Sequence, residues 1–205
     1  MFMLSILGFL KLPRVFIGKA KNPRWINPKS RNRYCYYQQN NSWMEFSIWE
    51  KWFLEQYVPT VSVFFRGENL PEKSLLFCDN CSAHGHSLSS PDSNHVLLFL
   101  PPLTTGYIQP MDQEVISNLK MKTKGLILDD YLNHREAPGE PIQNFVGDID
   151  TGFAVHAYVK AWEEISVENL QHAWKPLLAR YLDALSVDIQ TAAEHTFRQQ
   201  GRKIV

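Results

Sequence analysis

Two aspartates stand where two predicted strands end, and their positions favour metal chemistry. Asp79 directly follows the apolar run SLLFC, and Asp112 follows the loop that leaves the next apolar run, HVLLFL. In open α/β sheets, sites form at the carboxyl ends of strands and in the loops that leave them. Two carboxylates brought together there repel unless they share a cation, and Mg²⁺ prefers oxygen ligands. The pair therefore predicts metal-assisted phosphoryl transfer. The alternative is that each Asp caps a turn or a helix.

Three polar residues precede Asp112 in the same loop, Thr104, Thr105 and Gln109. Their side chains are of the kind that contacts phosphate oxygens. The alternative is a turn that is stabilised by threonine hydroxyls. The sequence is compatible with either a phosphate contact or a turn at these residues.

A second set of metal-ligand types overlaps the first aspartate. Cys78, Cys81, His84 and His86 form C-x₂-C-x₂-H-x-H, which contains zinc ligands. The spacing is too short for four ligands to converge, and Cys78 is predicted inside a strand, pointing away from its neighbour Asp79. We therefore expect Cys78 to be a small core residue and His86 to face solvent. A structural zinc module stays as a competing hypothesis.

Charge is distributed unevenly along the chain. Residues 1–44 hold eight basic side chains and no acid, which leaves 13 basic and 21 acidic groups in residues 45–205. A basic segment interleaved with aromatic residues suits a polyanion, because cations neutralise phosphates while rings stack on bases. Lys19, Lys21 and Arg24 are the leading candidates for phosphate contacts. The alternative is a solvated sheet edge.

The predicted elements would bring these residues together. Short strands are expected at 4–10, 14–17, 34–37, 74–78 and 95–100, since apolar runs there are bounded by turn residues. An aromatic stripe predicts a helix that begins at Asn41 or Ser42 and ends before Pro59.

The second half of the chain reads as mostly helical. A long helix is expected within 111–132, a loop over 133–152 and further helix from 153 to about 200, because apolar residues recur at helical intervals. The parallel or mixed sheet would be covered by these helices.

Composition excludes several classes of protein. The chain has 205 residues, of which 44% are hydrophobic, enough for one globular domain. Three cysteines fit a reducing compartment rather than a disulfide scaffold. No stretch approaches the roughly 18 apolar residues of a membrane span, and the apolar residues 1–10 are interpreted as a buried strand rather than a signal peptide.

Two strings in the middle of the chain carry a family resemblance. LLFCDNCSAH and VLLFLPPLTTGYIQPMDQ resemble the core signature of the DDE endonuclease domain of pogo/Tigger-type transposases, whose relatives include Jerky-like proteins and centromere protein B. KLPRVFIGKAKNPRW and AWEEISVENLQHAWKPL are similar to flanking pieces of that family. The resemblance covers about residues 4–178.

The resemblance implies an RNase H-like fold in which three acids bind two Mg²⁺ or Mn²⁺ ions and cut or join DNA strands. Asp79 would be the second acid and Asp112 the third, with Asn80 and His84 as further motif residues. The first acid is expected on an opening strand upstream of KLPRVFIGK, but the first acid of this chain is Glu45. The family also usually has Gly where this chain has Glu114, which is either a first-turn helix residue or an extra carboxylate.

These observations predict an α/β protein with an RNase H-like mixed sheet flanked by helices, incomplete at the N-terminus, with a helical C-terminal extension. Residues 1–132 would form the partial endonuclease domain, 133–152 a loop, and 153–205 the helical remainder. The predicted function is DNA binding with metal-dependent strand cleavage and transfer. The alternative is a domesticated or decayed, inactive DNA-binding or interaction protein. The family implies a nuclear location and DNA as partner, self-association is left open, and no membrane contact is expected.

Overall fold

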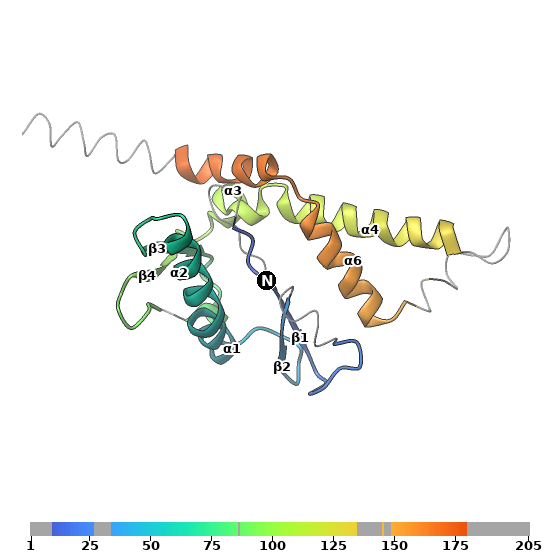
Figure 1. The fold of residues 1–205 in the computed structure, drawn as a ribbon. Helices are drawn as coiled ribbons and strands as arrows, with labels where there is room; N and C mark the ends of the chain where they lie inside the picture. The colour runs from blue at the N-terminus through green and yellow to red at the C-terminus, as the bar shows by residue number, and fades with distance from the viewer. Residues whose placement is uncertain (1–9, 27–33, 86, 135–144, 146–148, 180–205) are drawn as a thin grey trace, which may run out of the picture.

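The computed structural model describes residues 10–26, 34–85, 87–134, 145 and 149–179 (Figure 1). Its strands form two parallel pairs. Strand β1 (Arg14–Gly18) pairs with β2 (Tyr34–Gln38), and β3 (Ser74–Cys78) pairs with β4 (His95–Phe99). These four strands confirm the sequence predictions, while the strand expected at 4–10 lies outside the described residues.

The single mixed sheet that was predicted is not observed. Within the described residues, no backbone pairing joins β1–β2 to β3–β4, so the strands form two separate two-stranded sheets. The two pairs are instead connected through side chains that pack against one shared helix. The fold is α/β as expected, and the strands of the described residues form two pairs rather than one sheet.

That shared helix has three segments: α1 (Phe46–Trp52), the π-helical η2 (Phe53–Tyr57) and α2 (Val58–Gly67). The predicted start was wrong, because Ser42 lies in a turn with φ of 54° and the N-cap is Glu45. The predicted end before Pro59 was also wrong. The Val58 N–H donates to the Phe53 carbonyl five residues earlier, and Pro59 falls in the first turn of α2. A proline there costs little, because its missing N–H is not needed.

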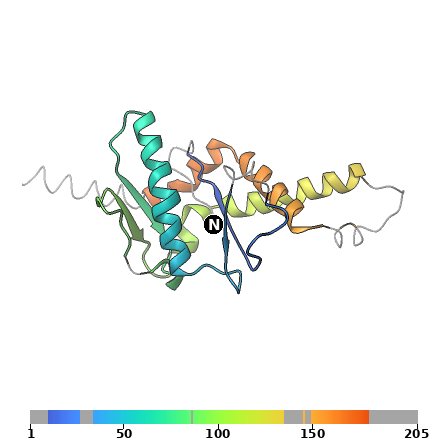
Figure 2. The ribbon, with the colours of Figure 1, turned by 60° about the horizontal axis from the view of Figure 1, so that its bottom comes forward.

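The helix lies between the two strand pairs, as Figure 2 shows from a tilted view, and its aromatic side chains are buried in the core that both pairs share. Buried side chains of this core come from the helix, from the first strand pair and its entry, and from the second pair: Trp49, Trp52, Phe53, Tyr57, Val61, Leu12, Val15, Leu76, Cys78 and Leu97. Each large side chain that is fully buried contributes about 2–3 kcal/mol to folding.

The remaining described elements are mostly helical. They are α3 (Thr105–Ile108), the short 3₁₀ turn η4 (Pro110–Asp112), α4 (Val115–His134), α6 (Thr151–Glu163) and a helix over 167–179. The predicted long helix is confirmed from Val115 onward, and the later helical region begins at Thr151, where Asp150 accepts a hydrogen bond from the Phe153 N–H at 2.6 Å. Most of the predicted loop at 133–152 and residues 180–205 lie outside the described residues.

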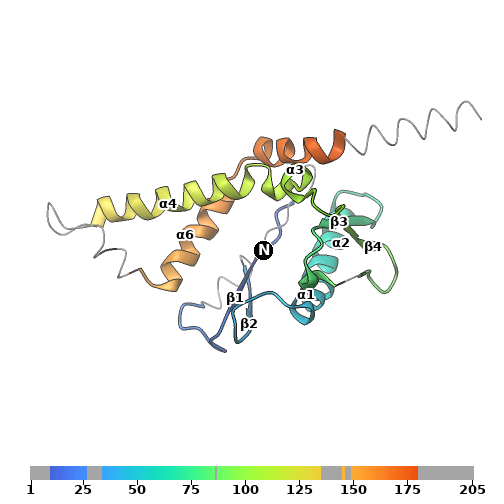
Figure 3. The same cartoon turned by 180° about the vertical axis from the view of Figure 1, so that it is seen from behind.

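Helices α4 and α6 cross and pack together (Figure 3). Val115 and Leu119 of α4 meet Ala161 and Trp162 of α6 in a second core. The helix over 167–179 covers the other face of β3, where Phe77 and Trp174 lie edge to face at 6.1 Å. None of the described helices is long and apolar enough to cross a bilayer.

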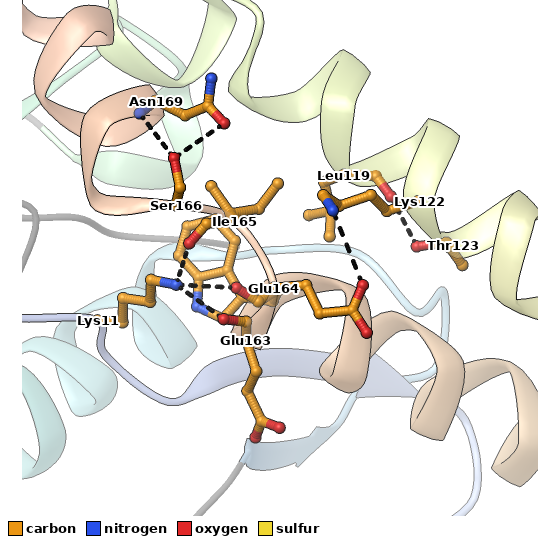
Figure 4. A network of polar contacts seen from close by, with 10 residues as sticks. Lys11, Leu119, Lys122, Thr123, Glu163, Glu164, Ile165, Ser166 and Asn169 are labelled. Atoms are coloured by element: carbon orange, nitrogen blue, oxygen red, sulfur yellow. Dashed lines mark hydrogen bonds and ion pairs between the residues drawn. The ribbon is translucent and has the colours of Figure 1, made fainter.

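Lys11 connects the start of the described chain to the end of α6 (Figure 4). Its Nζ donates to the carbonyls of Trp162, Glu163 and Ile165 at 3.1, 3.3 and 2.6 Å. A cation at a helix C-terminus satisfies unpaired carbonyls and interacts favourably with the helix dipole. Partial burial is the main cause that lowers the pKa of Lys11, with the nearby Arg14 charge adding to it.

Candidate functional site

Asp79 lies at the carboxyl end of β3 and is held by its own turn. Its Oδ1 accepts a hydrogen bond from the Cys81 N–H at 3.1 Å, which starts a turn into the short 3₁₀ helix η3 (Ser82–His84). This turn brings His84 back, so that its Nδ1 lies 2.8 Å from the Asp79 Oδ1. The turn therefore brings the His84 imidazole into contact with the Asp79 carboxylate.

Helix α1 packs against the His84 ring through Trp49. The ring centroids of Trp49 and His84 are 4.2 Å apart, and Trp49 is only 2% exposed. Gly85 follows with φ of 73°, and any side chain there would overlap the ring of Phe46. The turn that carries His84 thus packs directly against α1.

The ends of β3 and β4 are connected by two hydrogen bonds. The Asn80 side-chain amide donates to the Leu100 carbonyl, and the Leu100 N–H donates to the Cys78 carbonyl at 2.8 Å. Asn80 therefore has a structural role that the sequence analysis did not predict. It holds the loop that leads to Asp112 against the strand that leads to Asp79.

Asp112 ends the 3₁₀ turn η4, and its N–H donates to the Gln109 carbonyl at 3.0 Å. Although the side chain is exposed, neighbouring protein atoms partly desolvate the carboxyl and raise its pKa above the ordinary value. The negative charge of Asp79 raises the pKa of Asp112 further. A like charge disfavours ionisation of its neighbour, so the charge of Asp79 acts on the Asp112 carboxyl.

The loop before Asp112 is braced internally. The Thr104 hydroxyl donates to the Pro101 carbonyl at 2.6 Å, and the Gln113 side chain donates to the Gly106 carbonyl at 3.2 Å. For Thr104 this favours the turn interpretation over a phosphate contact. Thr105 accepts the Gln109 N–H through its carbonyl, while the Gln109 Oε1 is buried without a hydrogen-bond partner in the described part of the chain.

Glu114 is exposed at the start of α4 and has φ of 62°. This left-handed backbone favours glycine, which explains why a glycine suits the position. The conformation costs a residue with a side chain about 1 kcal/mol.

The zinc hypothesis finds no support in the described residues, among which no three His, Cys, Asp or Glu side chains are placed to hold a metal. Cys78 is 5% exposed, as predicted for a core residue. Burial, then the charges of Asp79 and Cys81, raise its pKa to about 12, so the metal-binding thiolate is disfavoured. His86 lies outside the described residues.

The predicted phosphate contacts lie elsewhere. Lys19, Lys21 and Arg24 are exposed on the loop after β1, which Figures 1 and 3 draw on the far side of the β1–β2 pair from β3 and β4. The structure does not bring them together with the aspartates.

The sequence analysis missed two lysines on α4. Lys120 and Lys124 are exposed, stand four residues apart on one helical face, and make no ion pair within the residues that the structure describes. Helix α4 starts three residues after Asp112, so these cations lie closer along the chain to the carboxylates than Lys19 does. The sequence feature that could have indicated these two lysines is the string KMKTK, which lies inside a predicted helix.

A family model described as DDE superfamily endonuclease matches residues 6–174. The chain belongs to this family. The match confirms the resemblance carried by the motif strings around Asp79 and Asp112, and DDE superfamily endonucleases generally use divalent metals.

Curated relatives of this DDE endonuclease domain include Tigger transposable element-derived proteins and Jerky proteins. The chain is 27% identical to human Tigger transposable element-derived protein 7, over 83% of its own length and 34% of the relative. It is also 27% identical to the human Jerky protein homolog and to the mouse Jerky protein, in each case over 83% of this chain and 29% of the relative. The chain thus spans about a third of the length of these relatives. No solved structure matches it.

Proposed function

We propose that this DDE endonuclease domain binds DNA and that Asp79 and Asp112 together hold a Mg²⁺ or Mn²⁺ ion for strand cleavage and transfer. The observation that carries the proposal is the hydrogen bond from the Asn80 side chain to the Leu100 carbonyl, which holds the loop that leads to Asp112 against the end of β3, where Asp79 lies. The charge of Asp79 also raises the pKa of Asp112. The carboxylates of Asp79 and Asp112 are suitable oxygen ligands for a hard divalent cation, whose positive charge would offset the repulsion between them.

The bound ion would activate the attacking oxygen and neutralise charge on the phosphate. The protein residues then act by orientation. His84 and the Cys81 N–H hold one oxygen of Asp79, and the braced turn from Gln109 presents Asp112. Lys120 and Lys124 would contact phosphates near the carboxylates, while Lys19, Lys21 and Arg24 would contact a more distant stretch of DNA. A location in the nucleus follows from this substrate.

A second candidate is DNA binding without cleavage. It is favoured by one observation: among the residues that the structure describes, no three His, Cys, Asp or Glu side chains are placed to hold a metal. A site with two carboxylates has less negative charge and fewer ligands than a site with three, so its affinity for a metal ion is lower.

Plasmid nicking separates the two candidates. We expect Mn²⁺- or Mg²⁺-dependent nicking by the wild-type protein and its loss in Asp112→Asn, because the substitution removes a ligand charge. Asp129→Asn, an exposed residue further along α4, is the matched control and should nick like the wild type. Equal nicking by wild type and Asp112→Asn would indicate contamination and contradict the cleavage proposal. Metal-independent DNA binding with no nicking would favour the second candidate.

DNA binding itself is tested by salt dependence. We expect log K to fall linearly with log salt, and the triple change of Lys19, Lys21 and Arg24 to Ala to reduce the slope by about 2–3. Fluorescence anisotropy with labelled DNA measures this. Lys51→Ala, which removes an exposed lysine on α1, is the control. Affinity that does not change with salt would contradict phosphate binding.

A further inference from the structure

A pocket of about 540 Å³ opens beside strand β2, away from the aspartates. Its walls come from the loop after β1, including Lys21 and Asn22, from residues Tyr34–Tyr37 of β2, and from Glu55 and Gln56 of η2. A cavity on one face of a strand is lined by alternate residues, because side chains alternate between faces. Four consecutive residues line this one, so the pocket runs along the edge of β2.

The hydrogen-bond pattern identifies the backbone groups at that edge. The Gly18 carbonyl accepts from the Gln39 N–H, and Gly18 lies opposite Gln38 in the parallel register. In a parallel pair, alternate residues turn both their N–H and C=O toward the partner strand. Residues 35, 37 and 39 therefore face β1, and Tyr36 directs its N–H and C=O outward. These two groups have no partner in the described part of the chain.

One aromatic wall of the pocket is held rigidly. The Tyr36 hydroxyl donates to the Ala20 carbonyl at 2.6 Å, and the Trp25 and Tyr36 rings lie edge to face with their centroids 5.6 Å apart. Gly18 leaves room for this ring, since a side chain there would overlap the Tyr36 hydroxyl at 2.6 Å. The ring is therefore positioned before any ligand arrives.

Polar groups of both kinds line the pocket around the edge of β2. The Gln56 Oε1 accepts a hydrogen bond from the Cys35 thiol at 3.5 Å, which leaves the Gln56 amide N–H groups to donate. Glu55 supplies an acceptor, and Lys21 supplies a cation from the opposite wall. A nucleobase presents donors and acceptors along one edge, a flat face for stacking and a phosphate beyond the sugar.

We propose that this pocket receives one nucleobase of an unpaired DNA strand, stacked on Tyr36 and read by Gln56 and the outward backbone of β2, with Lys21 at the phosphate. The inference rests on the proposed DNA binding and adds a base-specific site to it. An extended peptide could also pair with the edge of β2. The base fits better, because the loop after β1 and η2 both line the pocket and because the flanking loop carries Lys19, Lys21 and Arg24.

The experiment compares two labelled single-stranded oligonucleotides of equal length and charge, one with all its bases and one with abasic residues at its centre. Stacking and hydrogen bonds of one base should make the complete strand bind on the order of tenfold tighter. Gln56→Met keeps the side-chain volume and should remove most of that difference. Lys21→Ala should weaken both oligonucleotides alike, and Lys51→Ala neither.

Alkylation of Cys35 by N-ethylmaleimide, measured by mass spectrometry, reports directly whether the pocket is occupied. The complete strand should slow alkylation of Cys35, and the abasic strand should not. Equal salt-dependent affinity for the two strands, with Cys35 unprotected, would overturn the base pocket and leave DNA binding standing. Binding of neither strand would overturn both proposals. Protection of Cys35 by polyglutamate but by neither oligonucleotide would overturn the base in favour of a peptide.

Discussion

At the scale of single residues, the site is defined by how the surroundings of Asp79 and Asp112 act on their carboxyl groups. Asp79 is fixed by His84 and the Cys81 N–H, and its charge raises the pKa of Asp112. The folded protein therefore holds Asp112 in an environment that favours its neutral form. Functional sites commonly sacrifice stability in this way.

Replacing Asp112 by Asn should make the metal-free protein more stable at neutral pH. A raised pKa means that the folded state loses stability as pH rises through it, and a neutral side chain avoids that loss. Because the carboxyl is exposed, the gain should be no more than about 1 kcal/mol. Urea denaturation measures it. The gain should vanish below pH 4, where both side chains are neutral, and a destabilised variant at pH 7 would contradict the prediction.

At the scale of elements, polar side chains decide where helices and turns end. Lys11 caps α6 by reaching three carbonyls from another part of the chain. Asp92 closes the turn before β4, where its carboxylate accepts from the Ser90 hydroxyl, the Asn94 N–H and the Asn94 side chain. The Asp92 contacts are local, whereas the Lys11 contacts join segments far apart in the chain.

Lys11→Met should lower the free energy of unfolding by about 1–2 kcal/mol, because it keeps the aliphatic stem but leaves carbonyls of α6 unpaired. Urea denaturation followed by circular dichroism measures the change. Lys19→Met, at an exposed position, should change it by less than about 0.5 kcal/mol. Equal effects of the two substitutions would show that the cap adds nothing.

Asp92 should make stability depend on acid pH. Its hydrogen bonds lower its pKa to about 2, against an ordinary value of about 3.9. Its contribution is therefore present above pH 4 and lost as pH falls from about 4 to 2. Asp92→Asn should flatten the dependence of Tm on pH in that window. An unchanged dependence would show that other carboxyls dominate.

At the scale of the whole molecule, two cores are connected by the segment that enters β1. Leu12 and Val15 belong to the core around the aromatic helix, while Lys11 and Arg14 lie over the Trp162 ring at 5.7 and 5.9 Å. Trp162 is fully buried between α4 and α6. A substitution that destabilises the core between α4 and α6 should therefore also destabilise the strand pairs.

Trp162→Ala should cost about 3–5 kcal/mol, because it removes the largest side chain of the second core and leaves a cavity. Trp43→Ala, at a 72% exposed position, should cost less than about 0.5 kcal/mol. Thermal unfolding followed by circular dichroism compares them. Similar Tm values for the two variants would contradict the proposed role of Trp162.

Local patterns were sufficient to predict much of this molecule. The apolar runs predicted β3 and β4, helical periodicity predicted most of α4 and α6, and the motif strings predicted the family. These features depend on neighbours in the chain. The same local reasoning failed at Pro59, because sequence rules treat proline as a helix end and a π-helical turn accommodates it here.

The amino-acid sequence by itself determined the chemistry that is available: two aspartates after strands, a histidine five residues beyond the first, and a basic, aromatic segment before them. Only the tertiary structure decided which of these groups meet. It packed His84 against Trp49, arranged the described strands as two separate pairs, and opened a pocket along β2. The reason is that these contacts join residues far apart in the chain, whose distances depend on how whole elements pack.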